Sequence, residues 1–263
     1  TLRLLRLELG NLLALLRDSQ HQSEPERTAQ LASRLEQLFA NLGTPKALAE
    51  VTAARERAGL ALQGWSRARF DTERLRIERL RDESALDEAL RAARHLLRQT
   101  QDAGPEAYPG APYDLAHAHF LLGKLLKQAN AAEAAVRELS EARQRFQTLA
   151  SAGNTSAGRM AAVADAENGD CLTYLRRLQE AAAAYEAALE HAGANQHSPT
   201  VATHRMQLGL VRQRQGHYAA AATLYEAARQ TFELLGDPEN TAQASRQLGM
   251  ARKLDGQLLP ALQ

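Results

Sequence analysis

A pattern of small and large residues repeats at a 40-residue interval near the C-terminal end of this 263-residue sequence. Its members are Leu208-Gly209 with Leu248-Gly249, Gly216 with Gly256, Ala221 with Ala261, and Ala181, Tyr185 and Ala188 with Ala221, Tyr225 and Ala228. One copy of such a unit cannot bury its own apolar face, so successive copies must stack and share a continuous core. The repeat therefore predicts a stacked array of similar units.

Earlier copies are present but more widely spaced. Leu122-Gly123 begins one copy, with Ala135, Leu139, Ala142 and Phe146 at the offsets that follow Leu208-Gly209. The alanine column Ala85, Ala135, Ala181 and Ala221 has spacings of 50, 46 and 40 residues. The earlier copies therefore carry insertions.

Apolar residues recur at spacings of three and four, as from Ala85 to Leu97, and no sustained window alternates with period two. Together with the abundance of strong helix formers, this predicts an all-α chain. Thr44, Ser198 and Asp237 each precede a proline and are expected N-caps, and Ser23 with Glu26 has the form of a capping box. The expected helices span 2–18, 24–42, 45–63, 66–81, 83–102, 113–129, 131–150, 155–174, 178–192, 199–214, 218–236 and 239–254.

The repeat resembles the tetratricopeptide repeat (TPR), an α-α superhelix or solenoid of antiparallel helix pairs. Leu208, Gly209, Ala221, Tyr225 and Ala228 stand at the small and large positions of that family. Small residues let the two helices of a pair approach closely, and large ones fill the space beside them. Two positions depart from the pattern: Arg212 stands where an aromatic is usual, and Asn168 stands where Leu is usual. We therefore expect weakened contacts there and an irregular or lengthened first helix around Gly169.

Three segments follow from these observations. Residues 1–103 are expected to form degenerate N-terminal helical repeats, and residues 104–112, with three prolines and two glycines, a connector that is the best candidate for a hinge. Residues 113–263 are expected to form the TPR array, cut within its last repeat two residues after Ala261.

The N-terminal segment resembles the opening of the helical sensor region in STAND-type (NB-ARC class) signalling ATPases. Glu8, Asn11, Leu12 and Leu16 match a Glu-x-x-Asn-Leu-x-x-Ala-Leu helix, with Leu15 replacing the usual Ala. The next expected helix ends at Leu38-Phe39-Ala40-Asn41-Leu42-Gly43, near an aromatic residue and a glycine as in that class. The resemblance implies an upstream nucleotide-dependent switch domain.

Charge and motifs exclude several other classes of function. The formal charge of +1 excludes a polybasic arm and an acidic tail, and no apolar run is long enough to cross a bilayer. Gly123-Lys124 lacks the other residues of a phosphate-binding loop, and His117 and His119 are spaced wrongly to chelate a metal on one helix face. The single Cys171 is expected to be a small buried hydrophobe, and His191, His197, His204 and His217 scattered surface residues. We expect no catalytic residue, metal or cofactor.

Six arginines between positions 67 and 81 suggest nucleic-acid binding only until the acidic residues among them are counted. Asp71, Glu73, Glu78, Asp82 and Glu83 lie in or beside the same segment. Mixed charge of this kind is typical of a solvated helix face, which disfavours nucleic acid as a partner.

Resemblance to the repeat family implies a partner-binding site on the concave face, formed by the first helix of each pair. The residues it assigns there are His117, Phe120, Lys124, Lys127, Asp170, Thr173, Tyr174, Met206, Leu210, Gln213, Arg214, Arg246, Met250 and Lys253. Aromatic and Met side chains suit apolar anchors, and Arg and Lys suit carboxylates or backbone oxygens. An equally weighted alternative for any one of them is packing against the neighbouring turn of the superhelix.

These observations favour a non-catalytic module that binds a protein or peptide in the cytoplasm. The preferred context is the sensor or regulatory part of a larger bacterial-type signalling protein, with an intramolecular contact to the upstream switch domain. A free-standing TPR adaptor or scaffold is the alternative, and an enzyme in residues 50–115 has no catalytic constellation to support it.

Overall fold

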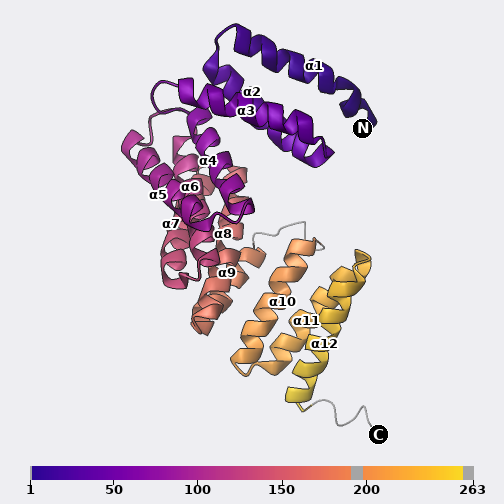
Figure 1. The fold of residues 1–263 in the computed structure, drawn as a ribbon. Helices are drawn as coiled ribbons and strands as arrows, with labels where there is room; N and C mark the ends of the chain where they lie inside the picture. Colours follow the sequence, from indigo (N-terminus) through magenta and orange to yellow (C-terminus); the bar gives the residue numbers. More distant parts are fainter. Residues whose placement is uncertain (1, 191–197, 257–263) are drawn as a thin grey trace. The chain divides into compact units, whose positions relative to one another are not determined.

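The computed structural model describes residues 2–190 and 198–256. Its described residues form twelve α-helices and no β-strand, which confirms the all-α prediction (Figure 1). The chain divides into two compact units, residues 1–118 (unit 1) and 119–263 (unit 2), and the division falls inside helix α6 (Ala111–Gln128). The predictions for His191, His197 and Ala261 lie outside the described residues.

Unit 1 contains five complete helices and the start of α6. The five are α1 (Leu2–His21), α2 (Pro25–Leu42), α3 (Pro45–Ala61), α4 (Arg67–Asp82) and α5 (Leu86–Ala103). Helix α2 contacts α1, α3 and α4, and α4 contacts α5. Leu16, Leu35, Phe39 and Val51 form the centre of the α1–α3 core and are at most 4% exposed.

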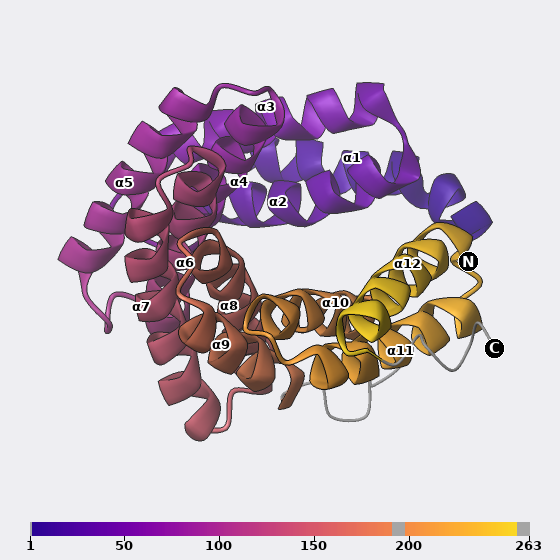
Figure 2. The same cartoon turned by 90° about the horizontal axis from the view of Figure 1, so that it is seen from below.

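Unit 2 holds the rest of α6 and six further helices: α7 (Ala132–Ser151), α8 (Thr155–Tyr174), α9 (Leu178–Glu190), α10 (Pro199–Arg214), α11 (Tyr218–Leu234) and α12 (Pro238–Leu254). From α7 onward each helix contacts the next, and α8 also contacts α10. Figure 2 shows α10 and α12 on one side of this array and α9 and α11 on the other. This is the TPR-like arrangement of helix pairs that the sequence predicts.

At Gly123, Gly169 and Gly209, the repeated glycine lies directly against a large side chain of the next helix. A Cβ atom added at Gly169 would lie 2.9 Å from the ring of Tyr185, and one at Gly209 would lie 2.7 Å from the ring of Tyr225. At Gly123 the same position would meet the side chain of Leu139 at 2.7 Å. Each large side chain therefore packs on the bare backbone of a glycine in the preceding helix, and such contacts require glycine there.

Helix starts follow the prolines, but not every expected cap forms. Ser198 and Asp237 accept hydrogen bonds from the backbone N–H groups of Val201 and Asn240, so these two N-caps are confirmed. The capping box is wrong: Ser23 has a φ of 55°, and Glu24 is the N-cap residue without a side-chain bond. Thr44 also makes no cap bond, because its hydroxyl donates to the carbonyl of Phe39.

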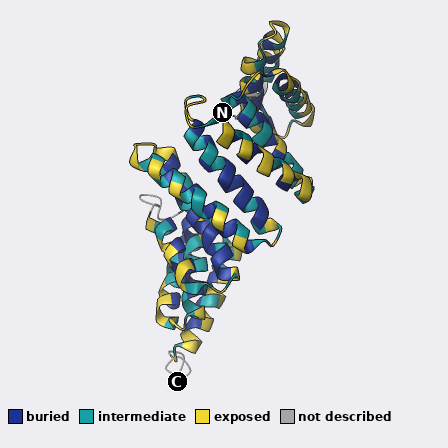
Figure 3. Ribbon diagram, turned by 90° about the vertical axis from the view of Figure 1, so that its left-hand side faces the viewer, coloured by how far each residue is buried: buried dark blue, intermediate teal, exposed yellow. Residues whose placement is uncertain are grey.

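Helix α8 is lengthened, with 20 residues against 16 in α10, but it is an unbroken α-helix. Helix α6 begins at Ala111, two residues before the expected start at 113. Buried positions follow one side of most helices and exposed positions the other (Figure 3). No described helix is both long and apolar enough to span a membrane.

Candidate partner-binding site

Positions one, four and five residues after each repeated glycine share one side of the first helices in unit 2. We call this surface the first-helix face and define it by Lys124, Lys127, Asp170, Tyr174, Leu210, Gln213, Arg214, Met250 and Lys253, together with Arg246, which lies one helical turn before Met250 on the same side of α12. Its two halves differ in chemistry, one on α6 and α8 and the other on α8, α10 and α12.

The α6–α8 half is a network of paired charges. Lys127 Nζ donates to Glu167 Oε2 at 2.6 Å and also pairs with Asp170, which in turn accepts a hydrogen bond from the Tyr185 hydroxyl. Burial alone would lower the pKa of the Lys127 ammonium, but its bonds to Asp170 and Glu167 raise that pKa above its ordinary value. These groups are therefore neutralised within the protein.

Lys124 of α6 and His204 of the neighbouring helix α10 adjoin this network. Lys124 Nζ lies 3.6 Å from Glu167 Oε1 and 5.5 Å from the centre of the Phe120 ring, and Phe120 itself is only 7% exposed. His204 on α10 has a pKa lowered by burial, although Asp170 and Glu167 act in the opposite direction. A His with a lowered pKa is neutral near pH 7.

The second half links α8, α10 and α12 through polar contacts at its base. Gln213 accepts from the Tyr225 hydroxyl at 3.3 Å, and its amide nitrogen donates to Met250 Sδ at 3.4 Å. The neighbouring Arg214 donates to the Thr173 carbonyl oxygen at 3.5 Å. Burial raises the pKa of Tyr225 to about 12, so its hydroxyl stays protonated and able to donate.

The outer surface of this second half combines exposed apolar groups with cations. Tyr174 is 69% exposed and Met250 49% exposed. Arg214, Arg246 and Lys253 are exposed, and none makes an ion pair with another described residue. An anionic partner with apolar side chains would find both kinds of contact here.

Four other residues that the sequence predicts for the partner-binding site make contacts within the protein. Phe120 and Thr173 are buried, and the Thr173 hydroxyl donates to the Gly169 carbonyl oxygen within its own helix. Met206 packs against two apolar clusters of α10–α12. His117 lies in unit 1, where its ring makes an edge contact with Phe70 at 6.3 Å between centroids. The geometry gives these four side chains packing contacts.

The sequence did not single out Glu167, Tyr185 or His204 as parts of the polar network. The sequence marks two of them only by their distance from a repeated glycine: Glu167 is two residues before Gly169, and His204 is five residues before Gly209. The two departures from the repeat pattern have polar partners instead of apolar ones. Arg212 pairs with Glu186 of α9, and Asn168 donates to the Ser140 hydroxyl at 3.3 Å.

Other sequence expectations concern single residues and charge. Cys171 is buried, which raises its pKa to about 11 although Lys127 acts in the opposite direction. Five of the six arginines of α4 form ion pairs, and Arg69 instead donates to the carbonyls of Leu62 and Gly64. No group of three His, Cys, Asp or Glu side chains able to hold a metal occurs in the part of the chain that the structure describes.

The N-terminal motif adopts the helical form expected of it. Leu16 and Phe39 are fully buried in one core, and Asn11 donates to Glu8 across one helical turn at 2.7 Å. Leu15 is 55% exposed, so its replacement of the usual Ala disturbs no close packing.

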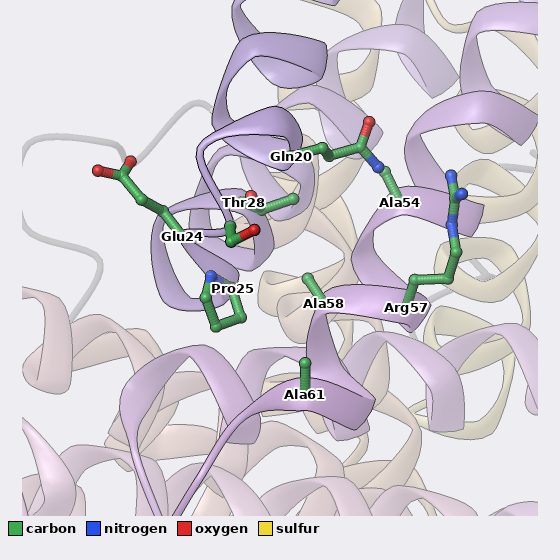
Figure 4. A pocket seen from close by; sticks show the side chains of 9 residues that line it. Gln20, Glu24, Pro25, Thr28, Ala54, Arg57, Ala58 and Ala61 are labelled. Atoms are coloured by element: carbon green, nitrogen blue, oxygen red, sulfur yellow. The ribbon is translucent and has the colours of Figure 1, made fainter.

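Unit 1 also holds a pocket of about 310 Å³ where α1, α2 and α3 meet (Figure 4). Ala54, Ala58 and Ala61 of α3 form one wall, and Pro25 and Thr28 of α2 lie opposite. Periodicity could not reveal this pocket, because the alanines that line it also read as ordinary core positions.

No protein-family model matches this chain, and no curated protein is similar to it in sequence. Solved structures are similar in fold. The apo form of RapI is 12% identical with a TM-score of 0.64, covering 97% of this chain and 73% of RapI. A Rap protein complexed with competence and sporulation factor is 15% identical with a TM-score of 0.59, covering 98% and 73%.

A third similar structure is a STAND signal-transduction ATPase with a tetratricopeptide repeat sensor from Pyrococcus horikoshii. It is 13% identical with a TM-score of 0.62, and the match covers 99% of this chain but 41% of that protein. Identities this low show a common fold and no more. The chain therefore has the fold of TPR-like helical repeat proteins.

Proposed function

We propose that the first-helix face, from α8 to α12, binds an extended peptide or protein segment that carries carboxylates and apolar side chains. The observation that carries the proposal is the cluster of exposed, unneutralised Arg214, Arg246 and Lys253 beside exposed Tyr174 and Met250. Arg, Tyr and Met are the residue types enriched where proteins bind each other. The α6–α8 half, with its charges already paired, supports this surface and contributes less to affinity.

We further propose that the chain acts as the sensor or regulatory part of a larger signalling protein. The fold it shares with the TPR-sensor STAND protein, over less than half of that protein, supports this context. A ligand can regulate only if it binds two states of the protein with different affinity, so binding must alter a contact with a switch domain. A free-standing adaptor, without any switch domain, is the second candidate.

The polypeptide sequence before Thr1 distinguishes these two contexts. A phosphate-binding loop GxxxxGK[ST] after a predicted strand supports the sensor. An initiator Met directly before Thr1 would support the free-standing adaptor instead. The proposed binding surface is the same in both contexts.

Binding itself can be tested with a random peptide library displayed on phage and selected against the full chain. The most enriched peptide then serves as a fluorescent probe for the wild type and for Arg214→Ala and Arg246→Ala. Each variant is expected to weaken affinity about tenfold, since each removes a charge-assisted contact. Arg137→Ala is the matched control, because Arg137 is exposed on α7 and has no ion pair among the described residues.

The proposed function is wrong if both variants bind the probe as the wild type does, or if Arg137→Ala weakens binding equally. Circular dichroism must show unchanged helicity in all three variants, so that a loss of binding is not a loss of folding.

A further inference from the structure

The pocket where α1, α2 and α3 meet in unit 1 is mostly apolar and reaches the core of that unit. Ala54 in its wall belongs to the α1–α3 core and is 1% exposed, and Ala58 belongs to a second apolar cluster with Ala29. From Ala54 to Ala61 this wall follows α3 for about 10 Å of the helix axis. A pocket of about 310 Å³ with such a wall suits a small molecule with an elongated apolar body.

Two polar side chains of the lining have hydrogen-bond donors to offer. Arg57 Nε donates to the Ala53 carbonyl oxygen at 3.2 Å, and the guanidinium makes no ion pair and no other hydrogen bond with a described residue. The side-chain amide of Gln20 has no hydrogen-bond partner in the described part of the chain. Both side chains lie on the side of the pocket where Ala54 is found (Figure 4). A ligand acceptor on this side therefore meets the free Nη1 and Nη2 donors of Arg57.

The lining has one other charged side chain, the carboxylate of Glu24. Glu24 accepts from Arg27 at 2.9 Å, so its charge is already paired, and it extends away from the pocket on the side opposite Arg57 (Figure 4). Arg57 is thus the only charged side chain of the lining that has no ion pair with a described residue. A single free guanidinium matches the charge and the two oxygens of one carboxylate.

We propose that this pocket binds a small amphipathic monocarboxylate, such as a medium-chain fatty acid. Its carboxylate accepts hydrogen bonds from Arg57, and its apolar chain lies along the alanines of α3. Binding is favourable because the chain leaves water, whereas the carboxylate stays at the exposed Arg57 and keeps part of its hydration. A neutral head group loses the charge-assisted bond, and a cationic head group is repelled by the guanidinium.

The pocket belongs to unit 1 and shares no residue with the first-helix face. Its occupancy can therefore be tested independently of the proposed function. Suitable probes are octanoate, 1-octanol and octylammonium, which share one apolar chain and differ in the charge of the head group. Each is titrated into the full chain in a calorimeter at constant ionic strength. The expected order of affinity is octanoate first, then 1-octanol, then octylammonium.

Two variants test the two parts of the ligand. Arg57→Gln should weaken octanoate about tenfold and leave 1-octanol unchanged. Its control is Arg98→Gln, because Arg98 is an exposed arginine of α5 in the same unit, without an ion pair among the described residues. Ala61→Phe fills the pocket from an exposed position at the end of α3 and should weaken octanoate and 1-octanol alike. Its control is Ala49→Phe, at an exposed alanine of the same helix outside the lining.

The proposal is overturned if octanoate does not saturate the protein, or if Ala61→Phe binds octanoate no more weakly than Ala49→Phe does. It is also overturned if 1-octanol or octylammonium binds as tightly as octanoate, since the guanidinium would then not select the head group. Equal effects of Arg57→Gln and Arg98→Gln would overturn it as well. Circular dichroism must show unchanged helicity in all four variants, so that a loss of binding is not a loss of folding.

Discussion

At the scale of single residues, the packing of Tyr185 on Gly169 shows why the repeat needs glycine. Tyr185 is 1% exposed and its hydroxyl is held by Asp170, so the ring has little room to move aside. The same arrangement recurs at Gly209 and Tyr225. Two copies of one contact, 40 residues apart, explain why these residues recur in the sequence.

Gly169→Ala is therefore expected to destabilise the protein by about 1–3 kcal/mol, because its Cβ would overlap the Tyr185 ring. Gly158→Ala in the same helix is the control. Its Cβ would meet only the Ala150 Cβ, at 3.6 Å, so the higher helix propensity of Ala should stabilise the protein by up to about 1 kcal/mol. Thermal unfolding followed by circular dichroism measures the stability of both variants. Equal shifts in melting temperature would show that the contact of Gly169 with the Tyr185 ring does not contribute to stability.

A second residue-scale effect concerns the buried carboxyl group of Asp114. Burial raises its pKa to about 6, although the Tyr108 hydroxyl and the charge of Arg67 act in the opposite direction and Asp71 adds to the rise. Between pH 4 and 6 the folded protein therefore retains a proton that the unfolded chain has released. Over that interval the free energy of unfolding must fall as pH rises.

Asp114→Asn removes this titration and serves as the reference. From pH 4 to pH 7 the wild type should lose at most about 3 kcal/mol of unfolding free energy relative to the variant. Urea unfolding at a series of pH values gives the difference, and a wild type that gains stability relative to the variant across this range would refute the assignment.

At the scale of helices, side-chain caps separate starts that look alike in the sequence. Ser198 caps α10 through the Val201 N–H at 3.2 Å, whereas Thr44 before α3 makes no cap bond. Ser198→Ala should destabilise the start of α10 by about 1 kcal/mol, and Thr44→Ala should have a smaller effect on α3. Hydrogen exchange of the first-turn amides in each helix measures both, and equal protection losses would contradict the difference.

The sequence predicted helix positions well because proline, glycine and three- to four-residue spacing are local signals. It failed at Ser23, whose positive φ excludes the capping box, because the Ser23 and Glu24 N–H groups donate to carbonyl oxygens of Gln20 and Ser19 at the end of α1. The side chains exposed on the first-helix face were harder to predict for a related reason. Lys127 pairs with Glu167 and Asp170, 40 and 43 positions away, and no local pattern reports which charges neutralise each other across helices. Exposure of Tyr174 and burial of the adjacent Thr173 likewise follow from packing alone.

At the scale of the whole molecule, the repeat generates a stack of pairs whose first helices present one surface in unit 2. Two compact units share helix α6, and the expected connector at 104–112 lies within the first of them. The division into segments 1–103, 104–112 and 113–263 stays a prediction. Unit 2 supplies the proposed surface for a peptide.

Peptide binding to this surface should depend on salt, because its cations are exposed. Raising the salt concentration from 50 to 500 mM should weaken the affinity of the library-selected peptide mainly by slowing association. Stopped-flow fluorescence measures the association and dissociation rate constants of the peptide separately. An affinity independent of salt would mean that Arg214, Arg246 and Lys253 do not contribute charge to binding.

Methyl NMR of methionine can locate a bound peptide on the first-helix face, since the chain has only Met160, Met206 and Met250. Met250 is exposed on the first-helix face, whereas Met160 lies near the start of α8 and outside that face. On adding the selected peptide to the full chain, the Met250 methyl resonance should shift and show contacts to the peptide, and the Met160 resonance should stay in place. A bound peptide that leaves the Met250 resonance unchanged would show that the peptide does not bind at the first-helix face.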